Sequence, residues 1–252
     1  MSRSSSTAEN VLDVLLLFDA TRPELTAEEI SRLIGTPRST TYRYIRTLRD
    51  KGFLERTAHD TFRLGPRLLK FARLAVRQED VGRVALPIME ELCRKTRETV
   101  LLTRLFDGHA VCVERVEAPQ AVRITFERGQ IQPLHAGASS KILLAYLPEE
   151  RVEKHLTQPL QAFTPNTVTD LDELKAQLRL VRRQGYCLSE SEVDDGATSV
   201  AVPILDRRRK LVAGLSVAGP TFRMDEAVID RVLSLLQDAA ATIQQQLNDV
   251  DL

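Results

Sequence analysis

The chain has 252 residues, 43% of them hydrophobic, and its 35 Lys and Arg balance 35 Asp and Glu. This length allows two domains with buried cores, and the neutral total argues against a general nucleic-acid coat protein. The longest uncharged apolar runs are far shorter than the ~20 residues that span a bilayer, and the Ser-rich start leads into no cleavable signal. We therefore expect a cytoplasmic protein that makes no membrane contact.

The cysteines and histidines give no sign of a metal centre. Cys93, Cys112 and Cys187 are odd in number and widely spaced, so neither a disulfide framework nor a zinc site is indicated. The four histidines are scattered without metal-ligand spacing, and no glycine-rich phosphate loop occurs. We expect buried thiols, no metal site and no cofactor.

The first predicted elements are two helices near the N-terminus. An amphipathic helix is expected over residues 9–20. A second begins at Thr26, because the Thr26 hydroxyl can accept from the Glu29 amide while the Glu29 carboxylate reaches back to the Thr26 amide. Gly35 and Pro37 end it, since Gly suits a C-terminal cap and the residue before Pro avoids helical geometry.

A third helix is predicted from about Pro37 to Lys51. Its inward positions are expected to be Tyr42, Ile45 and Leu48, which leaves its arginines on the other faces. Two short helices joined by a tight turn, the second one basic, form a helix-turn-helix whose second helix can enter the major groove of DNA.

A hairpin follows the third helix. Residues 53–56 and 61–64 nearly alternate apolar with polar side chains around a polar turn, which is typical of a wing. From Arg32 to Arg73, eleven Arg and Lys face three acids, a local excess of eight positive charges typical of a phosphate-binding surface. We expect the third helix to read the major groove and the wing to contact the backbone or minor groove. The predicted DNA contacts are Arg38, Ser39, Thr40, Tyr42, Arg43, Arg46, Arg56, His59 and Arg63.

The remainder of the chain predicts an α+β domain. A helix over 66–76 starts with Pro at a first-turn position and serves as a linker. Further helices are expected over 84–96, 139–147, 169–185 and 224–248. Strands are expected over 99–106, 110–116, 121–126, 200–205 and 211–218, because these segments are rich in Val, Ile, Leu and Thr. Together they indicate an antiparallel sheet with helices packed on it.

Seven stretches match one protein family: residues 33–43, 48–56, 62–65, 135–136, 141–145, 183–186 and 217–220. With them the chain resembles the IclR family of bacterial transcriptional regulators over nearly its entire length. The resemblance implies a winged helix-turn-helix DNA-binding domain over 1–65, a linker helix over 66–80, and a GAF-like effector-binding and oligomerisation domain over 81–252.

The resemblance also implies partners and a ligand pocket. It implies a repressor or activator of a catabolic operon, acting as a homodimer or homotetramer on a palindromic operator, with RNA polymerase as a further candidate partner. The effector would be a small organic acid or an aromatic metabolite. The family's pocket, carried over residue by residue, comprises Ala138, Ser139, Ser189, Glu190, Ser199 and Ser216. Backbone amides at a helix N-terminus and hydroxyls on facing strands suit a small carboxylate.

Two other functions stay open on the sequence. One is a DNA-binding or partner-binding module without a ligand. The other is a cytosolic hydrolase that uses the loop from His135 to Lys141. That loop lacks the second glycine of a nucleophile elbow, and Ala138 stands where an S-x-x-K motif needs serine. We therefore expect a regulator and not an enzyme.

Overall fold

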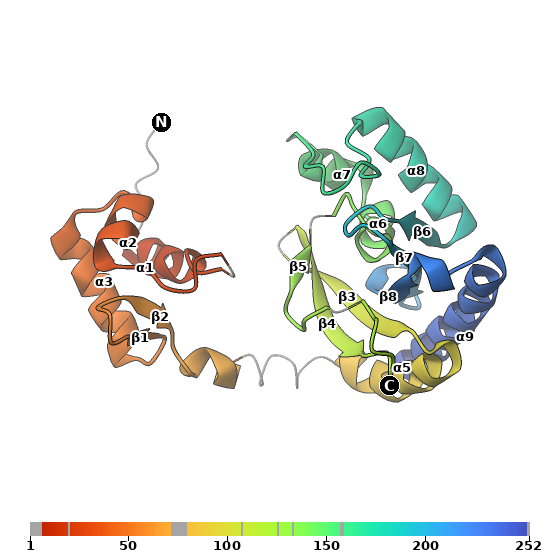
Figure 1. Cartoon of the computed structure of the whole chain (residues 1–252), viewed down its shortest axis with the longest axis horizontal. Coiled ribbons are helices and arrows are strands. Elements are labelled where there is room, and N and C mark those ends of the chain that lie inside the picture. Colours follow the sequence, from red (N-terminus) through yellow and green to blue (C-terminus); the bar gives the residue numbers. More distant parts are fainter. Residues whose placement is uncertain are drawn as a thin grey trace. The chain divides into compact units, whose positions relative to one another are not determined.

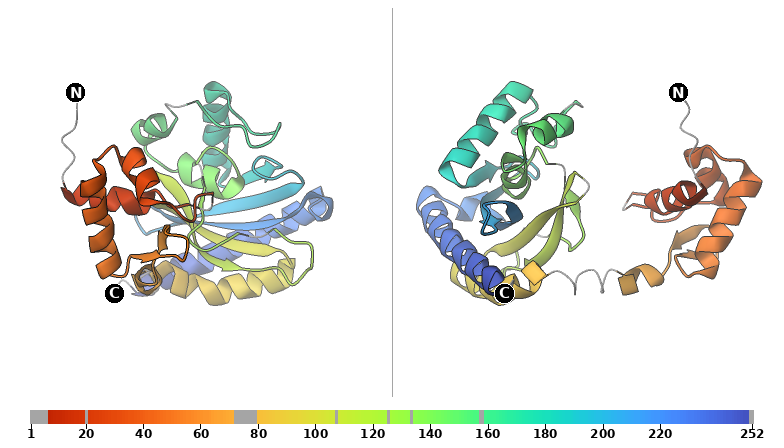
Figure 2. Two further views of the ribbon diagram at one scale, coloured as in Figure 1. Left: turned by 60° about the vertical axis from the view of Figure 1, so that its left-hand side comes forward. Right: turned by 180° about the vertical axis from the view of Figure 1, so that it is seen from behind.

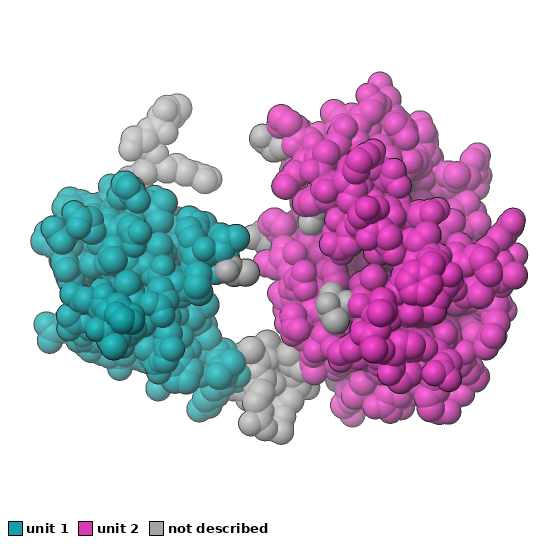
Figure 3. Space-filling model, in the orientation of Figure 1, with its two compact units in different colours: residues 1–78 teal, residues 79–252 magenta. Residues whose placement is uncertain are grey.

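The structure is a computed structural model that describes residues 7–19, 21–71, 80–106, 108–124, 126–132, 134–156 and 159–250. The chain divides into two compact units, residues 1–78 and 79–252 (Figure 3). This division falls inside the segment predicted as a linker. Pro66 is in a turn, residues 67–71 are helical, and residues 72–76 of the predicted helix lie outside the described residues. In the described part of the chain, no helix is both long and apolar enough to cross a membrane.

Unit 1 begins with three helices and a hairpin (Figure 1). These are α1 (Thr7–Leu16), α2 (Ala27–Ile34), α3 (Arg38–Asp50), β1 (Leu54–Arg56) and β2 (Phe62–Leu64). The predicted end of the first helix at residue 20 is wrong. After Leu16 the Asp19 carboxylate accepts from the amides of Thr21 and Arg22, at 2.8 and 2.9 Å, and these bonds form a turn in place of a further helical turn.

Local hydrogen bonds fix α2 as the sequence predicts. The Thr26 amide donates to Glu29 Oε2 at 2.8 Å, and the Glu29 amide donates to Thr26 Oγ1 at 3.2 Å. The bond from the Thr26 amide holds the pKa of Glu29 below its ordinary value. Gly35 ends the helix in the left-handed region, with φ of 67°, where a side chain would be strained.

The inward face of α3 differs from the prediction at one position. Tyr42 is 49% exposed, whereas Tyr44 is 4% exposed and packs in the core with Ile45 and Leu48. An α-helix has 3.6 residues per turn, so the residue four before Leu48 shares its face and the residue six before it does not. The expectation that Tyr42 faces the core is therefore wrong.

The predicted wing is confirmed as an antiparallel hairpin. Leu54 pairs with Leu64, and Arg56 with Phe62. Leu54 and Phe62 are buried against the helices of unit 1, and Asp60 takes a φ of 60° in the connecting turn.

Unit 2 is a six-stranded antiparallel sheet in the order β5-β4-β3-β8-β7-β6, with helices on both faces. Its strands are β3 (Thr99–Phe106), β4 (His109–Val116), β5 (Ile131–Gln132), β6 (Cys187–Glu190), β7 (Ala197–Leu205) and β8 (Leu211–Pro220). Its helices are α5 (Asp80–Thr96), α6 (Ala138–Ala145), α7 (Glu149–His155), α8 (Leu171–Gln184), the 3-10 turn η1 (Thr221–Arg223) and α9 (Glu226–Val250).

The strand predicted over 121–126 is wrong, because no described residue there is in a strand. Side chains of neighbouring strands satisfy its carbonyl groups instead. The Thr99 hydroxyl donates to the Ile124 carbonyl at 2.9 Å, and the Arg115 guanidinium donates to the Phe126 carbonyl at 2.6 Å. The short β5 and α7 were not predicted.

The sheet separates two cores (Figures 1 and 2). Val100 and Leu102 on β3 face the core beneath α5 and α9, and the alternating residues face the side of α6. Close approach of α6 depends on Gly214, since a Cβ atom there would lie 2.8 Å from the Ile142 side chain. All three cysteines are buried free thiols, and burial raises the pKa of Cys187 to about 12.

Candidate DNA-binding surface and ligand cavity

The outer face of α3 carries most of the predicted DNA contacts. Ser39, Tyr42, Arg43 and Arg46 are exposed at spacings of three and four residues, so they form one continuous face of the helix. Arg38 is also exposed, at the start of α3, and Thr40 is half-buried beside it. This face offers hydroxyl, aromatic and guanidinium groups in a single row.

Three of the four arginines of α3 form exposed ion pairs in the described structure, and Arg43 lies over the Tyr44 ring. Arg38 lies 3.5 Å from Glu28 of α2, while Arg46 and Arg49 share Asp50 at 3.7 and 3.8 Å. Exposed pairs of this kind contribute about 0–1 kcal/mol, so phosphate groups can replace the carboxylates at little cost. The four arginines of α3 face one acid on the same helix, and the helix is therefore strongly cationic.

The wing is less cationic than the charge count indicates. Arg56 donates through Nε to Asp60 at 2.7 Å, and Arg63 donates to Glu55 across the hairpin at 3.0 Å. Each predicted wing arginine thus engages an acid of the same hairpin. His59 is exposed at the turn between the strands. The positive field of unit 1 is concentrated on α3.

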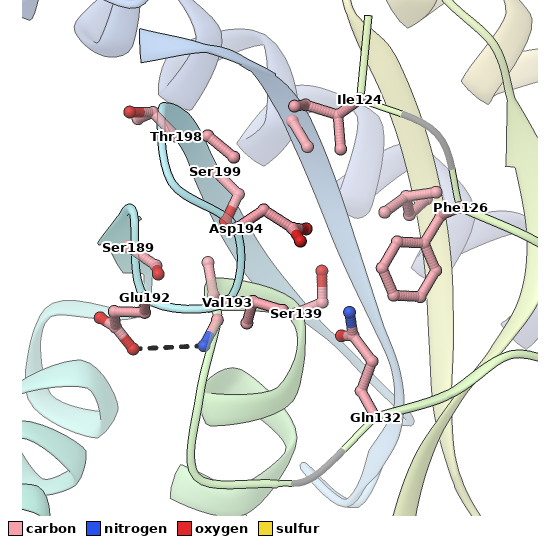
Figure 4. A pocket seen from close by; sticks show the side chains of 15 residues that line it. Ile124, Phe126, Gln132, Ser139, Ser189, Glu192, Val193, Asp194, Thr198 and Ser199 are labelled. Atoms are coloured by element: carbon pink, nitrogen blue, oxygen red, sulfur yellow. Dashed lines mark hydrogen bonds between the residues drawn. The ribbon is translucent and has the colours of Figure 1, made fainter. Parts of the chain in front are cut away.

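A small cavity in unit 2 lies between the start of α6, strands β6 to β8 and the loop 191–196 (Figure 4). Its volume is about 50 Å³, room for roughly four water molecules. In Figure 4, Ser189 and Ser199 lie on the left, opposite Ile124 and Phe126 on the right, and Gln132 lies below Phe126. The lining residues are Leu101, Ile124, Phe126, Gln132, Gly137, Ala138, Ser139, Ser189, Glu192, Val193, Asp194, Ala197, Thr198, Ser199 and Ala218.

The structure brings four of the six predicted effector residues to this cavity, namely Ala138, Ser139, Ser189 and Ser199. Ser216 is fully buried behind the wall, where its hydroxyl lies 2.7 Å from that of Ser139. Glu190 is exposed, because successive residues of β6 point to opposite faces and Ser189 takes the inward one. Ser216 and Glu190 therefore do not line the cavity.

Several polar groups at the cavity have donors or acceptors that make no hydrogen bond within the described structure. The Ser189 side chain is buried, and its hydroxyl has no hydrogen-bond partner among the described residues. Gln132 accepts from the Ser140 hydroxyl at 3.3 Å, which uses its carbonyl oxygen and leaves its amide protons. The amides of Ala138 and Ser139 lie in the first turn of α6 and have no acceptor within the helix.

A buried ion pair fixes the loop that covers the cavity. The Lys141 ammonium bonds the Glu192 carboxylate, and the two side chains are 3% and 9% exposed. Lys141 also donates to Gln177 of α8 at 3.1 Å, and Glu192 accepts from the Gly137 amide at 3.2 Å, the dashed line in Figure 4. The loop is thereby attached to both α6 and α8. No local pattern predicts a role for Glu192, because its partner lies 51 residues away.

The loop proposed for a hydrolase lacks a nucleophile paired with a base in the described structure. His135 Nε2 lies 2.9 Å from the Gln161 carbonyl oxygen, and its ring stacks on Phe163. The Ser139 hydroxyl bonds another serine, and Lys141 engages Glu192. These contacts hold the loop in place and do not activate an attacking group.

A winged helix-turn-helix with a cationic second helix, joined in one chain to a domain with a small cavity lined by both apolar and polar side chains, defines a ligand-responsive DNA-binding regulator. The IclR helix-turn-helix domain matches residues 7–58, and the domain described as bacterial transcriptional regulator IclR C-terminal matches residues 73–245. The chain belongs to the IclR family of bacterial transcriptional regulators.

Known relatives match the chain from end to end. The HTH-type transcriptional regulator KipR of Bacillus subtilis is 32% identical over 98% of this chain and 99% of that protein. An IclR transcriptional regulator from Silicibacter superposes with a TM-score of 0.87 at 28% identity, over 96% of each chain. An IclR homolog from Microbacterium hydrocarbonoxydans, solved in complex with 4-hydroxybenzoate, is 32% identical with a TM-score of 0.80, over 97% of this chain and all of that one.

Proposed function

We propose that this regulator binds a small hydroxylated carboxylic acid in the cavity at the start of α6, and that the ligand controls binding of unit 1 to a palindromic operator. The observation that carries the proposal is the Ser189 hydroxyl, which faces the cavity, lacks a hydrogen-bond partner among the described residues and lies at the same cavity as the first amides of α6. A hydroxyl that opens onto the cavity and makes no hydrogen bond to the protein can donate to a ligand or accept from it.

The chemistry of the lining favours this ligand class. The amides of Ala138 and Ser139 suit a carboxylate, because the N-terminus of a helix carries partial positive charge. The hydroxyls of Ser189 and Ser199 can donate or accept, so they suit alcohol or keto groups of the ligand. No lysine or arginine lines the cavity among the described residues, and Asp194 is exposed at its edge. A ligand with several negative charges is therefore disfavoured.

The volume of the cavity favours short aliphatic acids over aromatic acids. Apolar cavities of about 150 Å³ hold a benzene ring, whereas this cavity measures about 50 Å³. Short hydroxy and keto acids fit this volume, and aromatic acids require the loop 191–196 to move. Within the expected effector classes, the small organic acid is favoured over the aromatic metabolite here.

The DNA-bound form is proposed to be a homodimer or homotetramer. One winged helix supplies few contacts, and two copies reading two half-sites supply the area typical of specific binding. Leu12 and Leu16 on α1 are 60% and 79% exposed, and Leu69 is 72% exposed. Apolar side chains exposed on neighbouring turns of one helix are typical of a surface that another copy covers.

We further propose that the protein acts in the cytoplasm as an activator or a repressor of a catabolic operon. It is proposed to have no enzymatic activity. Relatives about 30% identical include the Pca operon regulatory protein of Acinetobacter baylyi and the Glycerol operon regulatory protein of Streptomyces coelicolor. Both names refer to operons, which supports the same role for this chain.

The experiment is a thermal-shift and calorimetric screen of the full chain with hydroxy and keto acids of two to six carbons. A binding acid should also change operator affinity in fluorescence anisotropy. Ser189→Leu fills the cavity and should abolish binding of the acid while leaving operator affinity without ligand intact. Glu190→Leu, on the opposite face of the same strand, is the matched control. Equal binding of the acid by both variants would refute the cavity as the effector site.

A further inference from the structure

A groove between α6, α7 and α8 lies apart from the cavity described above. Its volume is about 200 Å³, against about 50 Å³ for the cavity. The two sites are at opposite ends of α6. The cavity is lined by Ala138 and Ser139 in the first turn, and the groove by Leu144 and Ala145 in the last. None of the residues that line one site lines the other.

The floor of the groove is apolar. Leu144, Leu147 and Leu178 are at most 7% exposed, and Val152 of α7 forms a further wall. Apolar cavities of about 150 Å³ accept a benzene ring. The groove is therefore large enough for one six-membered ring packed on leucine side chains.

The rim of the groove is cationic. Lys175, Arg179 and Arg182 follow each other at spacings of four and three residues on one face of α8. Lys175 lies 3.6 Å from Glu153, the one acid that lines the groove among the described residues, and Arg182 donates to the Leu147 carbonyl at 3.4 Å. Arg179 has neither an ion pair nor a hydrogen bond within the described structure.

The helix dipole explains the position of only some of these cations. Cations in the last turn of a helix are stabilised by its negative end, which explains Arg182 and Arg183. Arg179 lies one turn earlier, beyond the reach of that effect. Its planar guanidinium can hold a carboxylate through two parallel hydrogen bonds. From the apolar floor, the volume and this uncommitted guanidinium, we propose that the groove is a second ligand site that binds an aromatic monocarboxylate.

The test is calorimetric titration of the full chain with benzoate, with benzyl alcohol as an uncharged probe of the same size. Benzoate should bind and benzyl alcohol should bind more weakly. Arg179→Gln removes the carboxylate partner and should weaken benzoate binding about fivefold, a loss typical of a partly exposed ion pair. Arg183→Gln makes the same change on the same helix outside the groove and should leave the affinity unchanged.

A third variant separates this site from the cavity. Ser189→Leu blocks the cavity and should leave benzoate binding unchanged. The proposal is overturned by absence of benzoate binding at millimolar concentration, by equal binding of benzyl alcohol, by equal losses in Arg179→Gln and Arg183→Gln, or by loss of benzoate binding in Ser189→Leu. These outcomes are independent of whether a small hydroxy acid binds in the cavity.

Discussion

Replacing Lys141 by methionine tests whether the buried ion pair holds unit 2 together. Met keeps most of the volume of the lysine side chain but removes its charge, so the Glu192 carboxylate is left with the Gly137 amide as its remaining hydrogen-bond donor. Breaking a buried pair by removing one partner typically costs about 3–5 kcal/mol, because the other charge stays buried without compensation. For a unit the size of residues 79–252, such a loss lowers the melting temperature by roughly 10 °C.

The double variant Lys141→Met with Glu192→Leu supplies the decisive comparison. Removing both charges removes the uncompensated carboxylate, so the double variant should lose less stability than Lys141→Met alone. Its remaining cost is about 1 kcal/mol for the unpaired Gly137 amide. Lys175→Met, which removes a lysine from an exposed pair with Glu153, should change stability by less than about 1 kcal/mol.

Differential scanning calorimetry of the full-length variants measures these effects. The reasoning is refuted if Lys141→Met is no more destabilising than Lys175→Met. It is refuted equally if the double variant costs as much as the sum of its two single variants, since that result would mean that the two charges do not stabilise each other.

Three further outcomes follow from the contacts of unit 1. Tyr44→Ala should cost about 3 kcal/mol or more in urea unfolding because the ring is buried, whereas Tyr42→Ala should cost under about 0.5 kcal/mol; equal losses would mean that the inward face of α3 is misassigned. Arg43→Ala should weaken operator binding by about 1–3 kcal/mol at fixed salt, and Arg63→Ala by less because Glu55 holds Arg63; fluorescence anisotropy would contradict this if the order were reversed. Thr26→Ala should destabilise unit 1 by about 1 kcal/mol. Since the Glu29 pKa is lowered in the folded state, the stability from the capping box is present above the ordinary Glu pKa and lost as pH falls through the lowered one. A melting temperature of a Glu29→Ala variant that keeps the wild-type dependence on acid pH would exclude this role of Glu29.

Several elements were predictable because their signals are local. The capping box at Thr26, the left-handed Gly35 and the Asp170 cap of α8 each act within a few residues. The predicted bounds of β3 agree with the structure, because residues 99–106 combine β-branched and leucine side chains. Interactions between residues a few positions apart can be recognised from the residue types at those positions.

Other features misled the sequence analysis for identifiable reasons. Tyr42 and Tyr44 are the same residue type two positions apart, so composition could not tell which one faces the core. Residues 121–126 have the composition of a strand, yet their carbonyls bond to the side chains of Thr99 and Arg115. In both cases the deciding partner lies elsewhere in the fold.

The sequence by itself determined the helix-turn-helix, the wing, the strands β3, β4, β7 and β8 of unit 2 and the family. Only the tertiary structure decided which serines share a cavity, that Ser216 lies behind Ser139, and that Lys141 meets Glu192. It also decided that Lys175, Arg179 and Arg182 of α8 lie at the rim of the groove between α6, α7 and α8. The physical reason is that these arrangements join residues tens of positions apart through strand register and helix packing, which no short-range pattern specifies.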